Sequence, residues 1–230
     1  MRLLFEKLIG LFKSTELPTK KELSKPKKKV TSTRIGELGE YKIDIQLDQL
    51  PKNYRYLSDL LLPNPKSKTG YSQIDHVVIT PYAIFVIETK NYNGEIKGGR
   101  DEKHWRVSNR FNIYNPLLQN YGHIKVIEKL VSSMYRVNFV SMISFTMRAR
   151  FSVDPELRKI HSNDLIVYDT ELSEYINRKV VRLKTETSEP ILTDSDIQTI
   201  YEVIKASNIT DSKRRQEHME KAKGINRNKK

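Results

Sequence analysis

The sequence predicts a mixed α/β domain, with a central sheet covered by helices. The first observation is the order of expected elements: a helix, three strands, a helix, two strands and further helices. The second is a pair of neighbouring segments, 73–80 and 82–90, that are apolar on both faces, as is typical of interior strands. The third is size, since 230 residues with 37% hydrophobic side chains suffice for one domain with attached tails.

The first elements are a helix, a strand and a loop. Apolar residues at helical spacing predict a helix over 33–47, and residues 54–62 read as a strand. Residues 63–70 hold two prolines and a glycine and form a turn-rich loop.

Two strands rich in Ile and Val follow, joined around Pro81. Alternation along them gives two apolar faces. One face carries Val77, Ile79, Ile84 and Val86, and the other carries Ile74, Val78, Phe85 and Ile87.

The second half adds short strands and turns over 94–111. A helix is predicted from Asn115-Pro116 to about residue 135, because proline favours the first helical turn. Thr193, with Asp196 three residues later, opens the last predicted helix. The other predictions are strands at 137–145 and 165–168 and helices at 170–179 and 194–207.

Positive charge is concentrated at the two ends of the chain. The net charge is +13, yet residues 35–212 contain equal numbers of acidic and basic side chains. We therefore predict three parts: an amphipathic helix with a basic linker (1–32), the folded domain (33–208) and a basic tail (209–230). Basic ends attract polyanions, or are simply solvated termini. The nucleic-acid-binding candidates are Lys27, Lys28, Lys29, Arg214 and Arg215.

The chain carries no cysteine, which excludes a disulfide framework, a thiolate zinc site and a cysteine nucleophile, and fits a cytoplasmic location. No apolar run approaches the ~20 residues of a membrane-spanning helix. Residues 1–13 form an amphipathic stripe that suits either peripheral membrane contact or docking on protein.

Two carboxylates and a lysine are predicted to converge at one end of the hairpin around Pro81. If Thr80–Ala83 forms the turn, Asp75 lies opposite Glu88 on the neighbouring strand. Glu88 and Lys90 share a face because they are two residues apart. A divalent cation such as Mg²⁺ or Mn²⁺ would relieve the repulsion between the acids, and a salt bridge with Lys90 is the alternative.

A helical acid belongs to the same prediction. Gly36 and Gly39 lie three residues apart in the first helix, which suits close packing of its backbone on the sheet. Glu40 would then reach Asp75 and Glu88, or else lie on a solvated face.

Five ordered segments resemble the nuclease-related domain family of the PD-(D/E)XK nuclease superfamily. They are Gly36–Glu40, Gln73–His76, Ile84–Gly94, Trp105 and Asn115–Asn120. The resemblance implies a restriction-endonuclease-like core with a central mixed sheet flanked by helices. It also implies metal-dependent phosphodiester hydrolysis, most simply of DNA.

The resemblance assigns roles by position. Asp75, Glu88 and the Thr89 carbonyl would bind the metal, and Lys90 would orient the attacking water. Glu40 would complete the site, and Gln119 would support it or contact nucleic acid. Related proteins often place a tyrosine four residues after that glutamine, where this chain has His123. A non-catalytic nucleic-acid-binding module and a membrane-associated accessory protein are the alternative functions.

Aromatic side chains near these segments have two interpretations. Tyr92, Trp105 and Tyr114 are expected in the core, and base stacking is the alternative. His76 is expected to be packed or hydrogen-bonded on the face opposite Asp75.

Overall fold

The computed structural model describes residues 41–187 and 189–227, all of which belong to one compact unit, Ser32–Lys230. Several predictions lie outside the described residues: the helix over 1–13, the basic linker with Lys27, Lys28 and Lys29, and Glu40. The three-part division of the chain therefore stays a prediction.

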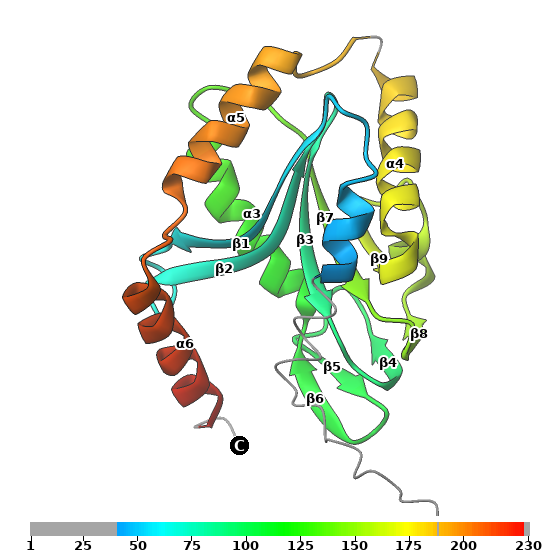
Figure 1. Cartoon of the computed structure of the whole chain (residues 1–230). Coiled ribbons are helices and arrows are strands. Elements are labelled where there is room, and N and C mark those ends of the chain that lie inside the picture. Colours follow the sequence, from blue (N-terminus) through cyan, green and yellow to red (C-terminus); the bar gives the residue numbers. More distant parts are fainter. Residues whose placement is uncertain (1–40, 188, 228–230) are drawn as a thin grey trace, which may run out of the picture. The chain divides into compact units, whose positions relative to one another are not determined.

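The main sheet has five strands in the order β1-β2-β3-β7-β9. Their bounds are β1 Arg55–Pro63, β2 Tyr71–Ile79, β3 Ile84–Lys90, β7 Phe139–Phe145 and β9 Asp164–Tyr168. The first three strands are antiparallel, whereas β7 and β9 run parallel to β3 (Figure 1). The predicted mixed α/β class is confirmed, and β3 is an interior strand paired on both edges.

Helices cover both faces of this sheet, as Figure 1 shows. On one face, α3 (Pro116–Val131) and α5 (Asp194–Ser207) bury apolar residues against the sheet. On the other face lie the helix over residues 41–47 and α4 (Leu172–Glu186). The two predicted apolar sets fall on these two faces, except that Ile74 packs with the α3 and α5 side. Ile74 lies in the part of β2 that pairs with β1 but not with β3.

A smaller four-stranded sheet follows β3, in the order β6-β5-β4-β8. Its strands are β4 Gly94–Gly98, β5 His104–Val107, β6 Phe111–Tyr114 and β8 Ala149–Val153. Strand β8 was not predicted, and it pairs in parallel with β4. Trp105 is fully buried under this sheet, as expected for a core aromatic. Two short 3-10 helices, η1 (Pro155–Arg158) and η2 (Asp169–Glu171), flank β9.

The C-terminal basic segment contains a helix, α6 (Ser212–Arg227), where the sequence indicated only a tail. Arg215 anchors it by donating to the Asp59 carboxylate at 2.6 Å and to the Asp59 carbonyl at 2.7 Å. The same guanidinium donates to the Ile209 carbonyl at 2.7 Å. No helix in the described part of the chain is long and apolar enough to cross a membrane.

Candidate active site

The hairpin of β2 and β3 has the predicted register. Thr80 and Ala83 close the turn, with the Thr80 amide donating to the Ala83 carbonyl at 3.0 Å. Pairing then runs from Ile79 opposite Ile84 to His76 opposite Ile87, where it stops. Strand β2 continues beyond this point paired with β1 alone, and Figure 1 shows β1 and β2 bending away from β3.

Asp75 stands at the point where the two strands part. Instead of lying in a regular ladder, its Oδ2 atom accepts from the Thr89 amide at 2.7 Å and from the Thr89 hydroxyl at 2.6 Å. Both bonds end on Oδ2, so Oδ1 accepts none from the described residues. Because the N–H and C=O of an extended residue point to the same side of a strand, the Thr89 carbonyl also faces β2.

Glu88 lies at the centre of a buried polar cluster. Its Oε1 atom accepts from Lys90 Nζ at 2.5 Å and from Gln119 Nε2 at 2.7 Å. Its Oε2 atom lies 3.3 Å from Nε2 of His123. Gln119 Oε1 accepts from Lys90 Nζ at 3.1 Å, which closes a triangle of Glu88, Lys90 and Gln119.

The charges in this cluster separate the pKa values of the two acids. Burial and the negative charge of Glu88 raise the pKa of Asp75, although the bonds from Thr89 oppose the shift. Burial also acts to raise the pKa of Glu88, but Lys90 and His123 outweigh it and lower that pKa to about 2. The carboxylate of Glu88 in turn raises the pKa of Lys90 against the effect of burial. Glu88 and Lys90 are therefore an ion pair at neutral pH.

Helix α3 is oriented so that Gln119 and His123 face Glu88. Asn115 caps its first turn by accepting from the Leu117 amide at 2.9 Å, and Pro116 occupies the first turn as predicted. Asn120 is fully buried and donates to the Val86 carbonyl and to the Ser141 hydroxyl, both at 2.8 Å. These bonds join α3 to β3 and β7 and fix its rotation.

The oxygen atoms at the β3 end suit a hard divalent cation. Asp75 and Glu88 repel each other, and Asp75 has an oxygen that accepts no bond from the described residues. Oxygen ligands of this kind are those that Mg²⁺ and Mn²⁺ prefer. Among the described residues, no group of three or more His, Asp or Glu side chains is placed to hold a metal ion. The two acids would thus need the Thr89 carbonyl, and Glu40 lies outside the described range.

The remaining predicted site residues are placed apart from this cluster. Arg214 is exposed on α6, whereas the guanidinium of Arg215 bonds within the chain. That anchoring role was not predicted, and contact of either arginine with nucleic acid stays a prediction.

The sequence also predicted the surroundings of His76 and Tyr114, which are not among the predicted site residues. His76 is buried, and its Nδ1 atom lies 3.0 Å from the Ser58 hydroxyl, which confirms a hydrogen-bonded role. Tyr114 is 46% exposed, so the expectation that it lies in the core is wrong.

His123 is the residue of the cluster that sequence reasoning did not assign. The spacing held a signal, since residues four apart lie on one face of a helix and Gln119 was already a candidate. In the sequence, His123 stands out only as a departure from the tyrosine of related proteins. Its contact with Glu88 depends on the rotation of α3, which no local pattern specifies.

Together, the mixed sheet, the parting hairpin and the acid–lysine cluster define a nuclease-like α/β domain. The nuclease-related domain family matches residues 35–146. An uncharacterized protein of Bacillus anthracis is 30% identical over 189 residues, which are 80% of this chain and 82% of that protein. The chain belongs to the nuclease-related domain family. No solved structure matches it significantly.

Proposed function

We propose that the chain is a metal-dependent nuclease that hydrolyses phosphodiester bonds, with DNA as the substrate. The observation that carries this proposal is the convergence of Asp75, Glu88 and Lys90 at the open end of β3, with Lys90 Nζ 2.5 Å from Glu88. A binding module needs no lysine ammonium paired with a buried carboxylate next to a second acid. Membership of the nuclease-related domain family supports the same reading.

The metal site would consist of the carboxylates of Asp75 and Glu88 and the carbonyl of Thr89, with Glu40 as the fourth candidate. A bound Mg²⁺ or Mn²⁺ ion supplies a lower pKa for coordinated water and offsets negative charge on the phosphate.

The chain's own residues supply position and charge. Lys90 carries an ammonium that holds the attacking oxygen and stabilises negative charge as it grows on the phosphate oxygens. Gln119 holds that ammonium through Oε1 and holds Glu88 through Nε2, so one amide orients both groups. Since the ammonium is already fixed before substrate arrives, little reorganisation is needed during the reaction.

Cleavage of circular and linear DNA, with Mg²⁺ or with EDTA, tests the proposal. Wild type should cut in Mg²⁺ and not in EDTA, and opening of the circle identifies an endonuclease. Asp75→Asn and Glu88→Gln should not cut. Lys97→Ala is the matched control, because Lys97 forms a lysine–glutamate pair with Glu95 at 3.2 Å outside the cluster, and it should cut like wild type. Binding of DNA without cleavage in any metal would instead identify the non-catalytic module.

The basic ends and the location complete the proposal. Lys27, Lys28, Lys29 and Arg214 would add sequence-independent affinity for the phosphate backbone. A chain without cysteine suits the cytoplasm. Peripheral membrane contact through residues 1–13 is a separate proposal, which flotation with liposomes, with and without those residues, tests.

A further inference from the structure

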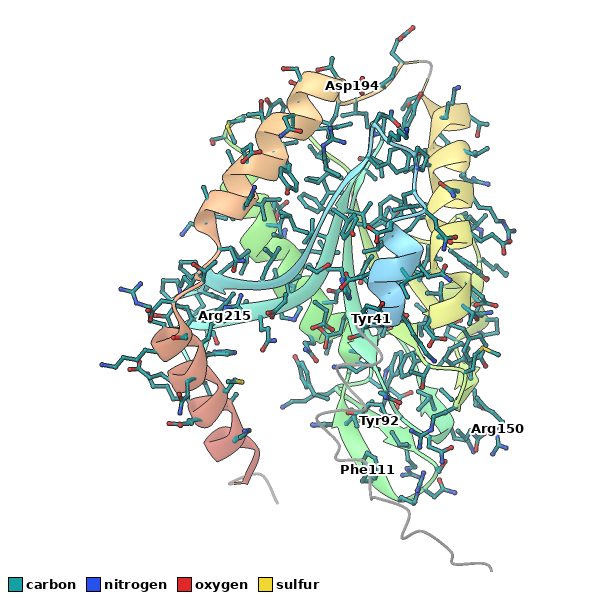
Figure 2. All side chains as sticks on the ribbon, viewed as in Figure 1. Tyr41, Tyr92, Phe111, Arg150, Asp194 and Arg215 are labelled. Carbon is teal, nitrogen blue, oxygen red and sulfur yellow. The ribbon has the colours of Figure 1, made fainter. Side chains whose placement is uncertain are left out.

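An aromatic pair lies where the chain passes from β3 into the second sheet (Figure 2). The rings of Tyr92 and Phe111 are 5.8 Å apart between centroids and are tilted by 60°. Tyr92 is half-buried, whereas Phe111 is 46% exposed, so one face of the pair is open to solvent. The exposure of a large apolar ring in this position has no explanation in the packing of the core.

The pair stands beside the candidate active site. Tyr92 lies two residues beyond Lys90 in the chain, so their backbones are at most about 7 Å apart. A ligand whose phosphate reached Lys90 would therefore place its neighbouring groups near these rings.

The pair is held rigidly. Arg110, which precedes Phe111, donates from its guanidinium to the Asn93 carbonyl, so the β5–β6 hairpin is tied to the segment that carries Tyr92. Ser108 in the same turn exchanges hydrogen bonds at 2.7 Å with the backbone of Glu95, one from each residue's amide. A side chain at Gly94 would collide with Ser108, so the hairpin packs directly on this backbone. Arg110 is exposed, so the residue before Phe111 adds a positive charge to this turn.

We propose that Tyr92 and Phe111 form a stacking platform for an unpaired base of single-stranded DNA whose phosphate lies at the active site. The inference rests on the proposed function and deepens it by naming the substrate class. Bases inside a duplex are stacked on one another and cannot cover an aromatic ring, whereas an unpaired base can. The exposed guanidinium of Arg110, next to Phe111 in the chain, favours a phosphate-bearing ligand over an apolar protein segment.

The test measures binding in EDTA, so that it does not depend on cleavage. Fluorescence anisotropy compares a labelled single-stranded oligonucleotide with a duplex of the same sequence. Wild type should prefer the single strand, and Phe111→Ala should weaken single-strand binding about tenfold while leaving duplex binding unchanged. Phe111→Tyr should retain the affinity of wild type.

Tyr114→Ala is the matched control. Tyr114 lies on the same strand, is also 46% exposed, and points to the opposite face of the sheet, edge-on to His104 at 6.3 Å. This variant should bind the single strand like wild type. An oligonucleotide that lacks one base at the contacted position should bind wild type and Phe111→Ala equally.

Equal affinities of Phe111→Ala and wild type for the single strand, or a preference for the duplex, would overturn the inference. Cleavage in Mg²⁺, assayed separately, keeps the two proposals distinct. Cleavage without a single-strand preference contradicts only the platform, and a single-strand preference without cleavage contradicts only the nuclease activity.

Discussion

The carboxylate of Asp75 accepts both hydrogen bonds that Thr89 donates, from the amide at 2.7 Å and from the hydroxyl at 2.6 Å. Thr89 therefore orients Asp75, one acid of the candidate metal site. The carbonyl of Thr89 is itself a candidate ligand of the same site. The contact also holds β2 and β3 together beyond the last residue pair of their ladder.

Thr89→Val should lower the affinity for metal, because it removes the hydroxyl donor while keeping the branched shape of the side chain. A net loss of about 1 kcal/mol for one hydrogen bond corresponds to about fivefold weaker binding. Titration calorimetry with Mn²⁺ measures this change. Thr89→Ser keeps the hydroxyl and should bind like wild type, so equal weakening of both variants would assign the effect to packing.

Asp75→Asn should raise the thermal stability of the metal-free protein. The pKa of Asp75 is raised above its usual value, so its ionised form destabilises the fold as pH rises through that pKa. An asparagine oxygen still accepts both bonds from Thr89 and carries no charge. Thermal unfolding at neutral pH in EDTA measures the gain. Addition of Mg²⁺ should then stabilise wild type and not the variant, since only wild type keeps both carboxylates of the proposed metal site.

Glu88→Gln should destabilise the protein at neutral pH by about 3–5 kcal/mol, because it leaves the Lys90 ammonium buried without its counter-charge. The pKa of Glu88 is lowered to about 2, so its contribution to stability is present above the unfolded value of 4.5 and is lost as pH falls toward 2. Urea unfolding in EDTA at stepped pH should show the difference between wild type and variant shrinking over this range. A difference that stays constant down to pH 2 would contradict the ion pair.

Lys90→Ala should reduce cleavage by about 10²–10³-fold while leaving Mn²⁺ affinity largely intact. The ammonium is not a metal ligand, so its loss removes charge stabilisation without removing a coordinating atom. Lys90→Met keeps the length of the side chain and should lose the same activity. If either variant cleaved DNA as fast as wild type, Lys90 would serve only as a salt-bridge partner of the acids, which is the alternative that the sequence also allowed.

Arg215→Ala should loosen helix α6, whereas Arg214→Ala should leave its stability unchanged. Arg215 bonds to Asp59 and Ile209, so its loss should raise amide hydrogen exchange throughout α6. Arg214 is exposed, so its loss should leave exchange unchanged and reduce the salt slope of DNA binding by about one. An unchanged salt slope in Arg214→Ala would count against a role of α6 in binding DNA.

Local chemistry in the sequence was enough to predict several elements closely. Helix α5 begins and ends at the predicted residues, because Thr193 and Asp196 form a reciprocal capping box. The β2–β3 register followed from one turn, since pairing on both sides of a short turn is set by its centre. Helix α4 extends to Glu186, beyond the predicted end, because its last turns alternate exposed basic residues with the buried Val180 and Leu183.

Features that depend on distant segments could not be predicted in this way. Strand β8 pairs with β4, from which it is far in sequence, and nothing local specifies that partner. The bond that Thr89 donates to Asp75 arises because β2 pairs with β3 only from His76 onward, which the alternating pattern does not signal. Helix α6 has few apolar residues, and Arg215 rather than a hydrophobic stripe attaches it to the domain.

Three of the four candidate ligands, Asp75, Glu88 and Thr89, belong to a single hairpin together with Lys90; Glu40 is the exception. Contacts between residues close in sequence lose little loop-closure entropy when they form, so this hairpin can assemble early. During synthesis it leaves the ribosome before Gln119 and His123 do, and Glu88 then has Lys90 but not its other two partners. The order of translation thus builds the reactive groups first and adds the helix that holds them in place afterwards.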